Sequence, residues 1–274
     1  MYTEYQPSHL LVPYIDSYWE FKGNPDYGMR IHILPDGCTD FIFTLGEVAN
    51  AVEEGSLIMQ PYRSYFVGPM TKYSELVAYT ESIHMFGVRF LPCGLSCFTN
   101  LPLHEFVNSR VSTNEMKAVF DDTFIEKLGE QKHVTDRIRV VEEYLLAYLA
   151  RHYQPADSHV AMAVNMINHS KGKRSVRSLM DDVCLCQRHF ERKFKHYTGF
   201  TPKEYSRIVK FKNAVELLRT TTSANLLTTA VDAGYYDLAH FSKEIKSMSG
   251  NTPASFLSLT VPEETTLTYI EPQR

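Results

Sequence analysis

The chain has 274 residues, of which 44% are hydrophobic and 22% charged, and its formal net charge is −4. This composition is ordinary for a globular protein, and the length allows one large or two ordinary domains. No apolar run approaches the ~20 residues that a membrane-spanning helix needs. The first residues also lack the basic-then-apolar layout of a secretory signal. We therefore expect a cytoplasmic protein without a membrane partner.

The net charge hides a strong asymmetry along the chain. Residues 1–157 carry a net charge of −9, residues 158–256 carry +7, and residues 257–274 carry −2. Such a division indicates two domains with different partners. The basic segment is a candidate for binding a polyanion such as a nucleic acid.

The first ninety residues show the period-two alternation of β-strands. Phe41, Phe43 and Leu45 alternate with the residues between them, and residues 86–90 repeat the pattern. Turn signals such as Pro35-Asp36-Gly37 separate the runs. Short strands with regular turns predict a small barrel or sandwich.

Two helices are predicted next, over residues 116–128 and 134–150, and Gly129 between them indicates an antiparallel hairpin. The second helix carries an apolar stripe with helical spacing. This stripe has two interpretations: it packs on its own domain, or it forms the interface of a homodimer. Its members are Ile138, Val141, Leu145 and Leu149.

A proline and a candidate helix cap, Ser158, place the domain boundary within residues 152–158. The predicted division is an N-terminal domain over residues 1–151, a helical domain over 159–257 and an unassigned tail over 258–274. Helices are expected at 159–168, 176–183, 187–196, 202–218, 226–233, 237–248 and 253–257.

The helical domain contains a pattern that occurs twice, offset by 51 positions. One copy runs from His189-Phe190 to Gly199-Phe200-Thr201-Pro202, and the other runs from His240-Phe241 to Gly250-Asn251-Thr252-Pro253. An internal repeat of this kind predicts one structural unit built twice. Each copy reads as a helix-turn-helix, so the pair is suited to two successive major grooves of DNA.

These motifs resemble the paired helix-turn-helix domain of AraC/XylS-type transcriptional regulators over about 100 residues. The resemblance rests on Phe190, Phe194, Lys195, Gly199, Thr201, Pro202, Tyr205, Gly234, Tyr235, His240, Phe241, Lys246, Gly250, Thr252, Pro253 and Phe256. It implies contacts to base edges from Gln187, Arg188, Glu191, Arg192, Leu238, Ala239 and Ser242. It implies contacts to DNA phosphates from Lys195, Lys243 and Lys246.

The chain departs from the family pattern in two places. Cys184 and Cys186 stand where Gly and Ser are favoured, and Cys186 is the poorer helix cap. Leu238 and Ala239 offer no bidentate polar side chain to a base, so the second helix reads less sequence than the first.

The N-terminal half is similar, more weakly, to the cupin-like effector domains of the same family through residues 33–40 and 86–95. The similarity implies a small β-barrel followed by a dimerisation hairpin, so the fold class is α+β. The sequence lacks the His-x-His pair that a cupin metal site needs. The spacing of the cysteines is typical neither of a disulfide framework nor of a zinc site. We expect no metal and no cofactor. The candidate ligand-pocket residues are Trp19, His32, Asp40, His84 and Arg89. The alternative is that they are ordinary surface and core residues.

Three functions remain open at this stage. The first is a dimeric DNA-binding regulator, activator or repressor, whose N-terminal domain senses a small-molecule effector or a partner and which works with RNA polymerase. In the second, the N-terminal half only dimerises. The third is a DNA-repair enzyme with a cysteine acceptor, for which Cys38 is the single candidate. No catalytic motif is otherwise present, so we expect a protein that is not an enzyme.

Overall fold

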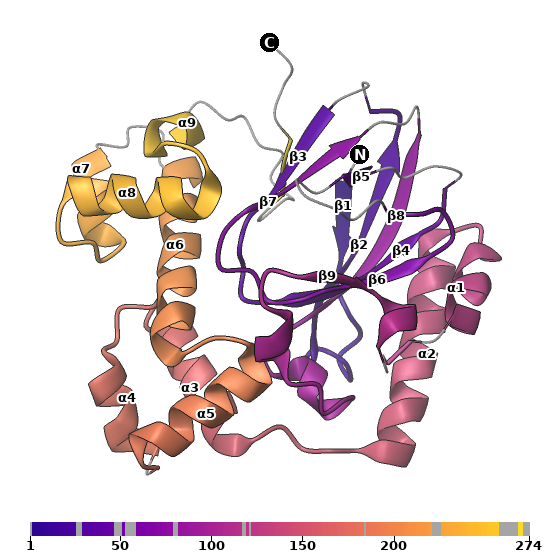
Figure 1. The fold of residues 1–274 in the computed structure, drawn as a ribbon, viewed down its shortest axis with the longest axis horizontal. Coiled ribbons are helices and arrows are strands. Elements are labelled where there is room, and N and C mark those ends of the chain that lie inside the picture. Colours follow the sequence, from indigo (N-terminus) through magenta and orange to yellow (C-terminus); the bar gives the residue numbers. More distant parts are fainter. Residues whose placement is uncertain are drawn as a thin grey trace.

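The computed structural model describes residues 2–25, 29–46, 51–52, 59–78, 82–116, 119–120, 122–183, 185–220, 226–257 and 268–270. A β-rich domain with two helices lies beside a helical domain, and one long connection joins them (Figure 1). The expected α+β architecture of two different domains is confirmed.

The β-domain contains two antiparallel sheets. The larger has the order β1 (Tyr2–Tyr5), β2 (Ile15–Gly23), β8 (Ile83–Phe90), β4 (Thr39–Thr44), β6 (Ser64–Val67) and β9 (Arg110–Ser112). The smaller has the order β10 (Thr268–Ile270), β3 (Met29–Ile33), β7 (Ser74–Ala78) and β5 (Ala51–Val52). The expected barrel is not closed, because β1 and β9 lie at opposite edges of the same sheet instead of pairing.

Alternation along the central strands divides this domain into two apolar layers. Phe41, Phe43 and Phe86 are fully buried on the face that packs against α1 (Asp122–Gly129) and α2 (Val134–His152). Ile42 and Met85 lie on the opposite face, between the two sheets. Burying one such aromatic side chain stabilises the fold by about 1.5–3 kcal/mol.

The apolar stripe of α2 packs within its own chain. Val141 and Leu145 are 0% exposed in the core under the large sheet, and Ile138 and Leu149 pack at its edge. The first two side chains therefore cannot form the dimer interface considered above. The interpretation in which the stripe covers its own sheet is the one the structure favours.

The helical domain follows the expected order closely. Its helices are α3 (Ser158–His169), α4 (Val176–Val183), α5 (Gln187–Thr198), α6 (Pro202–Thr220), α7 (Leu226–Asp232), α8 (Leu238–Ser249) and α9 (Pro253–Leu257). Asp157 rather than Ser158 caps α3, because its carboxylate accepts from the backbone N–H groups of His159 and Val160. None of the helices in the described part of the chain is long and apolar enough to cross a membrane.

The two copies of the sequence repeat have the same geometry at their ends. Gly199 ends α5 with φ +82° and Gly250 ends α8 with φ +75°, a left-handed conformation that glycine adopts without strain. Just before each glycine, a buried hydroxyl group donates a hydrogen bond to a backbone carbonyl of the same helix. Thr198 Oγ1 donates to the carbonyl of Phe194 at 2.7 Å, and Ser249 Oγ donates to the carbonyl of Ile245 at 2.7 Å.

The C-terminal tail returns to the β-domain. Strand β10 pairs antiparallel with β3, so residues 268–270 extend the smaller sheet at its edge. The sequence provided no assignment for this segment. Both ends of the described chain therefore lie in the β-domain (Figure 1).

Candidate nucleic-acid interface

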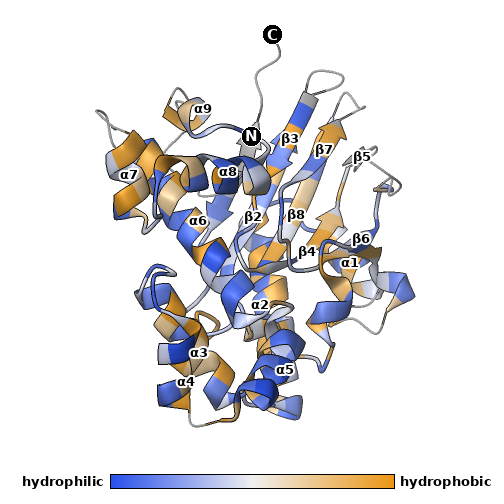
Figure 2. Ribbon diagram, turned by 60° about the vertical axis from the view of Figure 1, so that its left-hand side comes forward, coloured by the Kyte–Doolittle hydropathy of each residue, from blue (hydrophilic) through white to orange (hydrophobic). Residues whose placement is uncertain are grey.

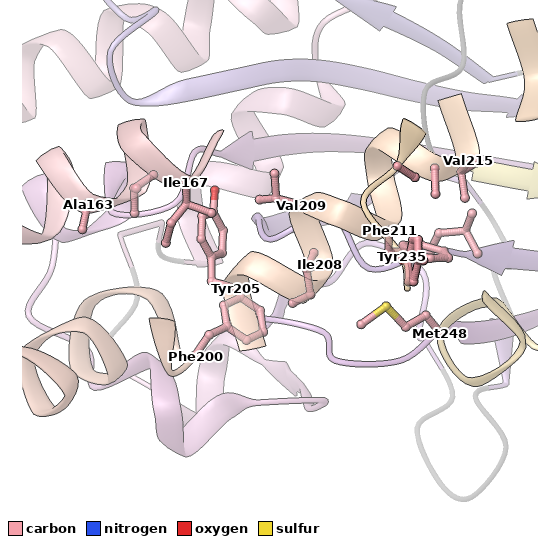
Figure 3. Close-up of a cluster of buried hydrophobic side chains, with 14 of the residues drawn as sticks. Ala163, Ile167, Phe200, Tyr205, Ile208, Val209, Phe211, Val215, Tyr235 and Met248 are labelled. Carbon is pink, nitrogen blue, oxygen red and sulfur yellow. The ribbon is translucent and has the colours of Figure 1, made fainter. Parts of the chain in front are cut away.

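Helix α6 is the common core of the two helix-turn-helix units. It stands upright between α4 and α5 at one end and α7 and α8 at the other (Figure 1). Tyr205 and Ile208 pack with Phe200 toward the first unit, and Phe211 and Val215 pack with Tyr235 and Met248 toward the second (Figure 3). One continuous apolar cluster therefore joins both units.

The start of α6 is fixed by a capping box. Thr201 Oγ1 accepts from the backbone N–H of Glu204 at 3.2 Å, and Glu204 Oε2 accepts from the backbone N–H of Thr201 at 2.7 Å. This reciprocal pair satisfies two backbone donors that a helix start leaves unpaired. The helix therefore begins at Pro202, the first residue of the helix expected over residues 202–218.

Helix α5 buries one side and exposes the other. Phe190 and Phe194 are fully buried, whereas most residues on the opposite side are exposed, and this helix is strongly hydrophilic in Figure 2. Gln187 donates to Glu191 Oε1 at 2.8 Å, and an Arg192 guanidinium nitrogen lies 3.2 Å from the His189 ring. These local bonds hold the polar side chains along the exposed face. The predicted DNA-contacting residues on this face are Gln187, Arg188, Glu191, Arg192 and Lys195.

The second helices of the two helix-turn-helix units, α5 and α8, are called the recognition helices below, and they differ at the cap position that precedes each helix. Asp237 caps α8 by accepting from the backbone N–H of His240 at 2.7 Å. Cys186 occupies the equivalent position of α5 and forms no side-chain cap, although its backbone is extended as a cap requires. The weak cap inferred from the sequence is therefore present. Cys184 lies outside the described residues.

Helix α8 buries Phe241 and Ile245 and exposes the side that carries the other predicted contacts. Leu238, Ala239, Lys243 and Lys246 are exposed, and Ser242 is half-buried. Tyr236, directly before the Asp237 cap, is 92% exposed. Tyr236 is not among the DNA contacts predicted from the sequence, although its place in the turn before α8 was a usable signal.

The β-domain contacts the C-terminal ends of both recognition helices through one segment, Gly68–Tyr73, which we call the strap. A β-carbon at Gly199 would lie 2.4 Å from Pro69 Cγ, and one at Gly250 would lie 2.8 Å from Tyr73 Cζ. The backbone N–H of Tyr73 also donates to the carbonyl of Met248 at 2.8 Å. The strap therefore touches α5 and α8 at equivalent points of the repeat.

A second connection to α5 comes from the linker between the domains. Lys193 Nζ lies 2.6 Å from Asp157 Oδ2, so the carboxylate that caps α3 also holds the first recognition helix. Near the end of α5, His196 Nε2 lies 3.2 Å from Asn100 Oδ1. Burial and the neighbouring His104 lower the pKa of His196.

The space between the two sheets forms a cavity of about 50 Å³ with mostly apolar walls. Trp19, Asp40 and Arg89 from the predicted pocket line it. His32 and His84, which the sequence analysis grouped with them, do not. His32 pairs with Glu75 and stacks on Tyr73 of the strap at 5.4 Å, and His84 lies on the helix-facing side, 2.8 Å from Glu20.

The polar end of this cavity is built around Arg89. Its guanidinium lies 3.3 Å from carboxylate oxygens of Glu4, Asp36 and Asp40. Trp19 Nε1 donates to Asp40 at 2.6 Å. Burial raises the pKa of Asp40 to about 6 despite the opposing effect of Arg89. One arginine thus balances several buried carboxylates.

Cys38 is unsuited to the alkyl-acceptor role considered for it. The thiol is only 5% exposed, and burial raises its pKa well above the usual value. A cysteine nucleophile reacts as the thiolate, and a raised pKa removes that form. The geometry thus argues against a repair enzyme acting through this residue.

Two protein families match separate parts of the chain. Residues 3–112 match a family described as a domain of unknown function (DUF6597), and residues 179–258 match a family described as a helix-turn-helix domain. No curated protein sequence matches the chain.

Solved structures of ToxT from Vibrio cholerae have a similar fold. One has 9% identity and a TM-score of 0.52, covering 88% of this chain and 98% of ToxT. ToxT bound to (E)-4-(8-methylnaphthalen-1-yl)but-3-enoic acid has 10% identity and a TM-score of 0.51 with the same coverage. ToxT with a bound unsaturated fatty acid has 11% identity and a TM-score of 0.50, covering 88% and 95%. At such identities the likeness concerns the fold alone.

Proposed function

We propose that this chain, a DNA-binding transcriptional regulator of the AraC/XylS type, inserts α5 and α8 into two successive major grooves on one face of the DNA. The observation that carries this proposal is the shared core on α6, with Phe190 and Phe194 buried on one side and Phe241 and Ile245 on the other. Two exposed helices on one scaffold suit grooves that recur every ~34 Å. The domain limits of residues 1–151 and 159–257 belong to the same proposal.

Sequence is read mainly by α5. Arg188 and Arg192 are exposed and can each donate two hydrogen bonds to guanine, and Glu191 can accept from the amino group of cytosine. Gln187 donates a hydrogen bond to Glu191, so these two side chains contact the bases together.

Compared with α5, helix α8 contributes less to sequence specificity and more to sequence-independent affinity. Leu238 and Ala239 can contact a thymine methyl group, and Ser242 can bond to either kind of base. The exposed ammonium groups of Lys195, Lys243 and Lys246 bind phosphates, which fixes the register without reading the sequence.

The N-terminal domain receives a small-molecule effector in the cavity between its sheets. Apolar walls with Asp40 and Arg89 at one end suit an apolar molecule with one polar group. ToxT, a protein of similar fold, has been solved with carboxylic acid ligands of this general character. At about 50 Å³ the cavity must widen to hold such a molecule. The alternative is an N-terminal half that only dimerises.

The strap provides a physical route from the cavity to the DNA. Met70 lines the cavity, while Pro69 and Tyr73 of the same segment contact the ends of α5 and α8. A ligand that displaces Met70 therefore moves the contacts of both recognition helices.

A homodimer, contact with RNA polymerase and a cytoplasmic location complete the proposal. The dimer interface must lie outside Val141 and Leu145, since these side chains are buried within one chain. Analytical ultracentrifugation of the full chain, with and without DNA, measures the stoichiometry directly.

The test of DNA recognition is selection of genomic fragments by the purified protein, followed by footprinting of those retained. Two protected segments about one helical turn apart, both dependent on sequence, are expected if both helices read bases. Arg192→Ala should raise the protein concentration needed to protect one segment and relax its sequence preference, and Arg139→Ala, a matched loss of charge on α2, should leave both unchanged. A library without any enriched fragment would refute the proposal.

The effector is tested separately by thermal melting. A ligand in the cavity raises the melting temperature in a concentration-dependent manner. Filling the cavity with Ile42→Phe should remove that response while DNA retention persists. If no apolar acid raises the melting temperature, the N-terminal half only dimerises.

A further inference from the structure

Tyr236, in the turn between α7 and α8, has no role in the DNA contacts proposed above. In the described part of the chain no other large apolar side chain is as exposed, whereas its neighbour Tyr235 is buried in the core that Figure 3 shows. The Tyr235 ring packs edge-on against Phe241 of α8, with the ring centres 5.1 Å apart. One tyrosine of the pair therefore fixes the turn, and the other is left in solvent.

Hydrogen bonds hold the turn on both sides of Tyr236. The backbone N–H of Tyr235 donates to the carbonyl of Ala230 at 2.8 Å, and Lys210 Nζ donates to the carbonyl of Gly234 at 3.3 Å. On the other side, the capping bond described above fixes the start of α8. Because the backbone is already held, binding through Tyr236 costs little more than the freedom of its two side-chain torsions.

Tyr236 lies at the opposite end of α8 from the strap. The strap contacts the C-terminal end of this helix, at Met248 and Gly250. The helix has 12 residues that rise about 1.5 Å each, so roughly 18 Å separate its two ends. In helix-turn-helix proteins the N-terminal residues of the second helix contact base edges. The proposed insertion of α8 therefore brings Tyr236 and Leu238 to the bases.

The two helix-turn-helix units differ in chemistry at this place. In the first unit the equivalent positions hold a partly buried leucine and two exposed polar residues, namely Leu185, Gln187 and Arg188. In the second unit they hold three exposed residues with aromatic or aliphatic surface, which we call the apolar tip: Tyr236, Leu238 and Ala239. The first unit thus offers hydrogen-bond donors to the bases, and the second offers an apolar surface.

We propose that the apolar tip selects thymine in the DNA segment that α8 contacts, with Tyr236 as the residue that covers the 5-methyl group. This inference rests on the proposed insertion of α8 into a major groove. Of the four bases, thymine alone presents a methyl group in that groove. An apolar surface gains free energy by covering this methyl group, whereas it leaves the hydrogen-bonding groups of guanine or cytosine desolvated and without a partner. The tip therefore distinguishes A·T from G·C pairs without a bidentate hydrogen bond.

The test replaces thymine by uracil, which lacks only the methyl group and forms the same base pair. Single uracils are placed in a selected duplex, within the segment whose protection Arg192→Ala leaves unchanged, and the affinity of the full chain is measured by competition titration. Removing a contacted methyl group should weaken binding about fourfold, the value expected for exposing one buried carbon atom. Uracil outside both protected segments should have no effect. Equal affinities for the thymine and uracil duplexes would overturn the proposal.

Three variants assign the methyl contact to Tyr236. Tyr236→Ala removes an exposed side chain, so the melting temperature should stay the same while the thymine preference is lost at one position or more. Tyr236→Phe should keep the preference, because the ring covers the methyl group and the hydroxyl does not. Tyr153→Ala, at another exposed tyrosine, is the matched control and should also keep it. A thymine preference that survives undiminished in Tyr236→Ala refutes the role of Tyr236.

The outcomes separate this inference from the function on which it rests. A protein that retains no DNA fragment refutes both, whereas a two-segment footprint with equal affinities for thymine and uracil refutes the methyl contact alone. If Tyr236→Ala leaves the affinity for every duplex unchanged but abolishes transcription by added RNA polymerase, the apolar tip contacts a protein and the proposal is wrong.

Discussion

Replacing Cys186 with serine should stabilise the protein, because α5 lacks the side-chain cap that α8 possesses. The two positions are equivalent in the repeat, and Asp237 shows the bond that is missing at Cys186. The backbone at Cys186, with φ −65° and ψ 142°, already has the extended conformation of a capping residue. The side chain is exposed, so the exchange disturbs no packing.

The expected gain is about 1 kcal/mol in the free energy of unfolding, the usual difference between a capping serine and a residue that does not cap. For a chain of this size it corresponds to a rise of roughly 2–4 °C in melting temperature. Thermal melting followed by circular dichroism is a suitable assay. Cys186→Ala is the control, and Asp237→Ala should lose a similar amount. If Cys186→Ser and Cys186→Ala melt together, the capping argument is wrong.

Three further outcomes are expected. Arg192→Ala should weaken specific DNA binding by about 1–3 kcal/mol and relax base preference, as measured by competition titration; equal losses on specific and random DNA would contradict a base contact. Lys246→Ala should weaken both kinds of binding and lower the slope of log affinity against log salt by about 1, and an unchanged slope would exclude a phosphate contact. The raised pKa of Asp40 means that the folded state binds its proton more tightly than the unfolded chain, so this group lowers stability as pH rises from about 4 to about 6. Asp40→Asn should remove that decline in urea titrations, and an identical pH dependence in the two proteins would refute it.

The helical domain was predictable because its signals are local. Gly199 and Thr201-Pro202 mark the end of one helix and the start of the next, and α5 and α6 begin at the expected residues. The cap of α3 was misplaced by one residue, because Asp157 and Ser158 are both competent caps and only the fold selects between them.

The β-domain was less predictable because its pairings are distant in sequence. Strand β10 pairs with β3, although most of the sequence separates the two strands. No local sequence pattern predicts this pairing. Whether strands close a barrel or form two sheets depends on which edges meet, and alternation does not contain that information.

The wrong placement of His84 in the predicted ligand pocket was avoidable. On β8, residues 84, 86 and 88 share one face, and Met85 and Arg89 share the other. The alternation visible in the sequence therefore separates His84 from Arg89. The strap, by contrast, has no distinguishing composition, and only the structure places Pro69 and Tyr73 against the two glycines.

The continuous core on α6 has a consequence for the DNA itself. Both recognition helices are packed into one apolar cluster, so the distance and the twist between them are properties of the protein. Where the groove spacing of straight B-DNA differs from that distance, the duplex must curve or unwind to meet both helices. The energy of that deformation depends on base steps that no side chain touches. We therefore expect flexible pyrimidine–purine steps to be enriched between the two contacted segments of its binding sites.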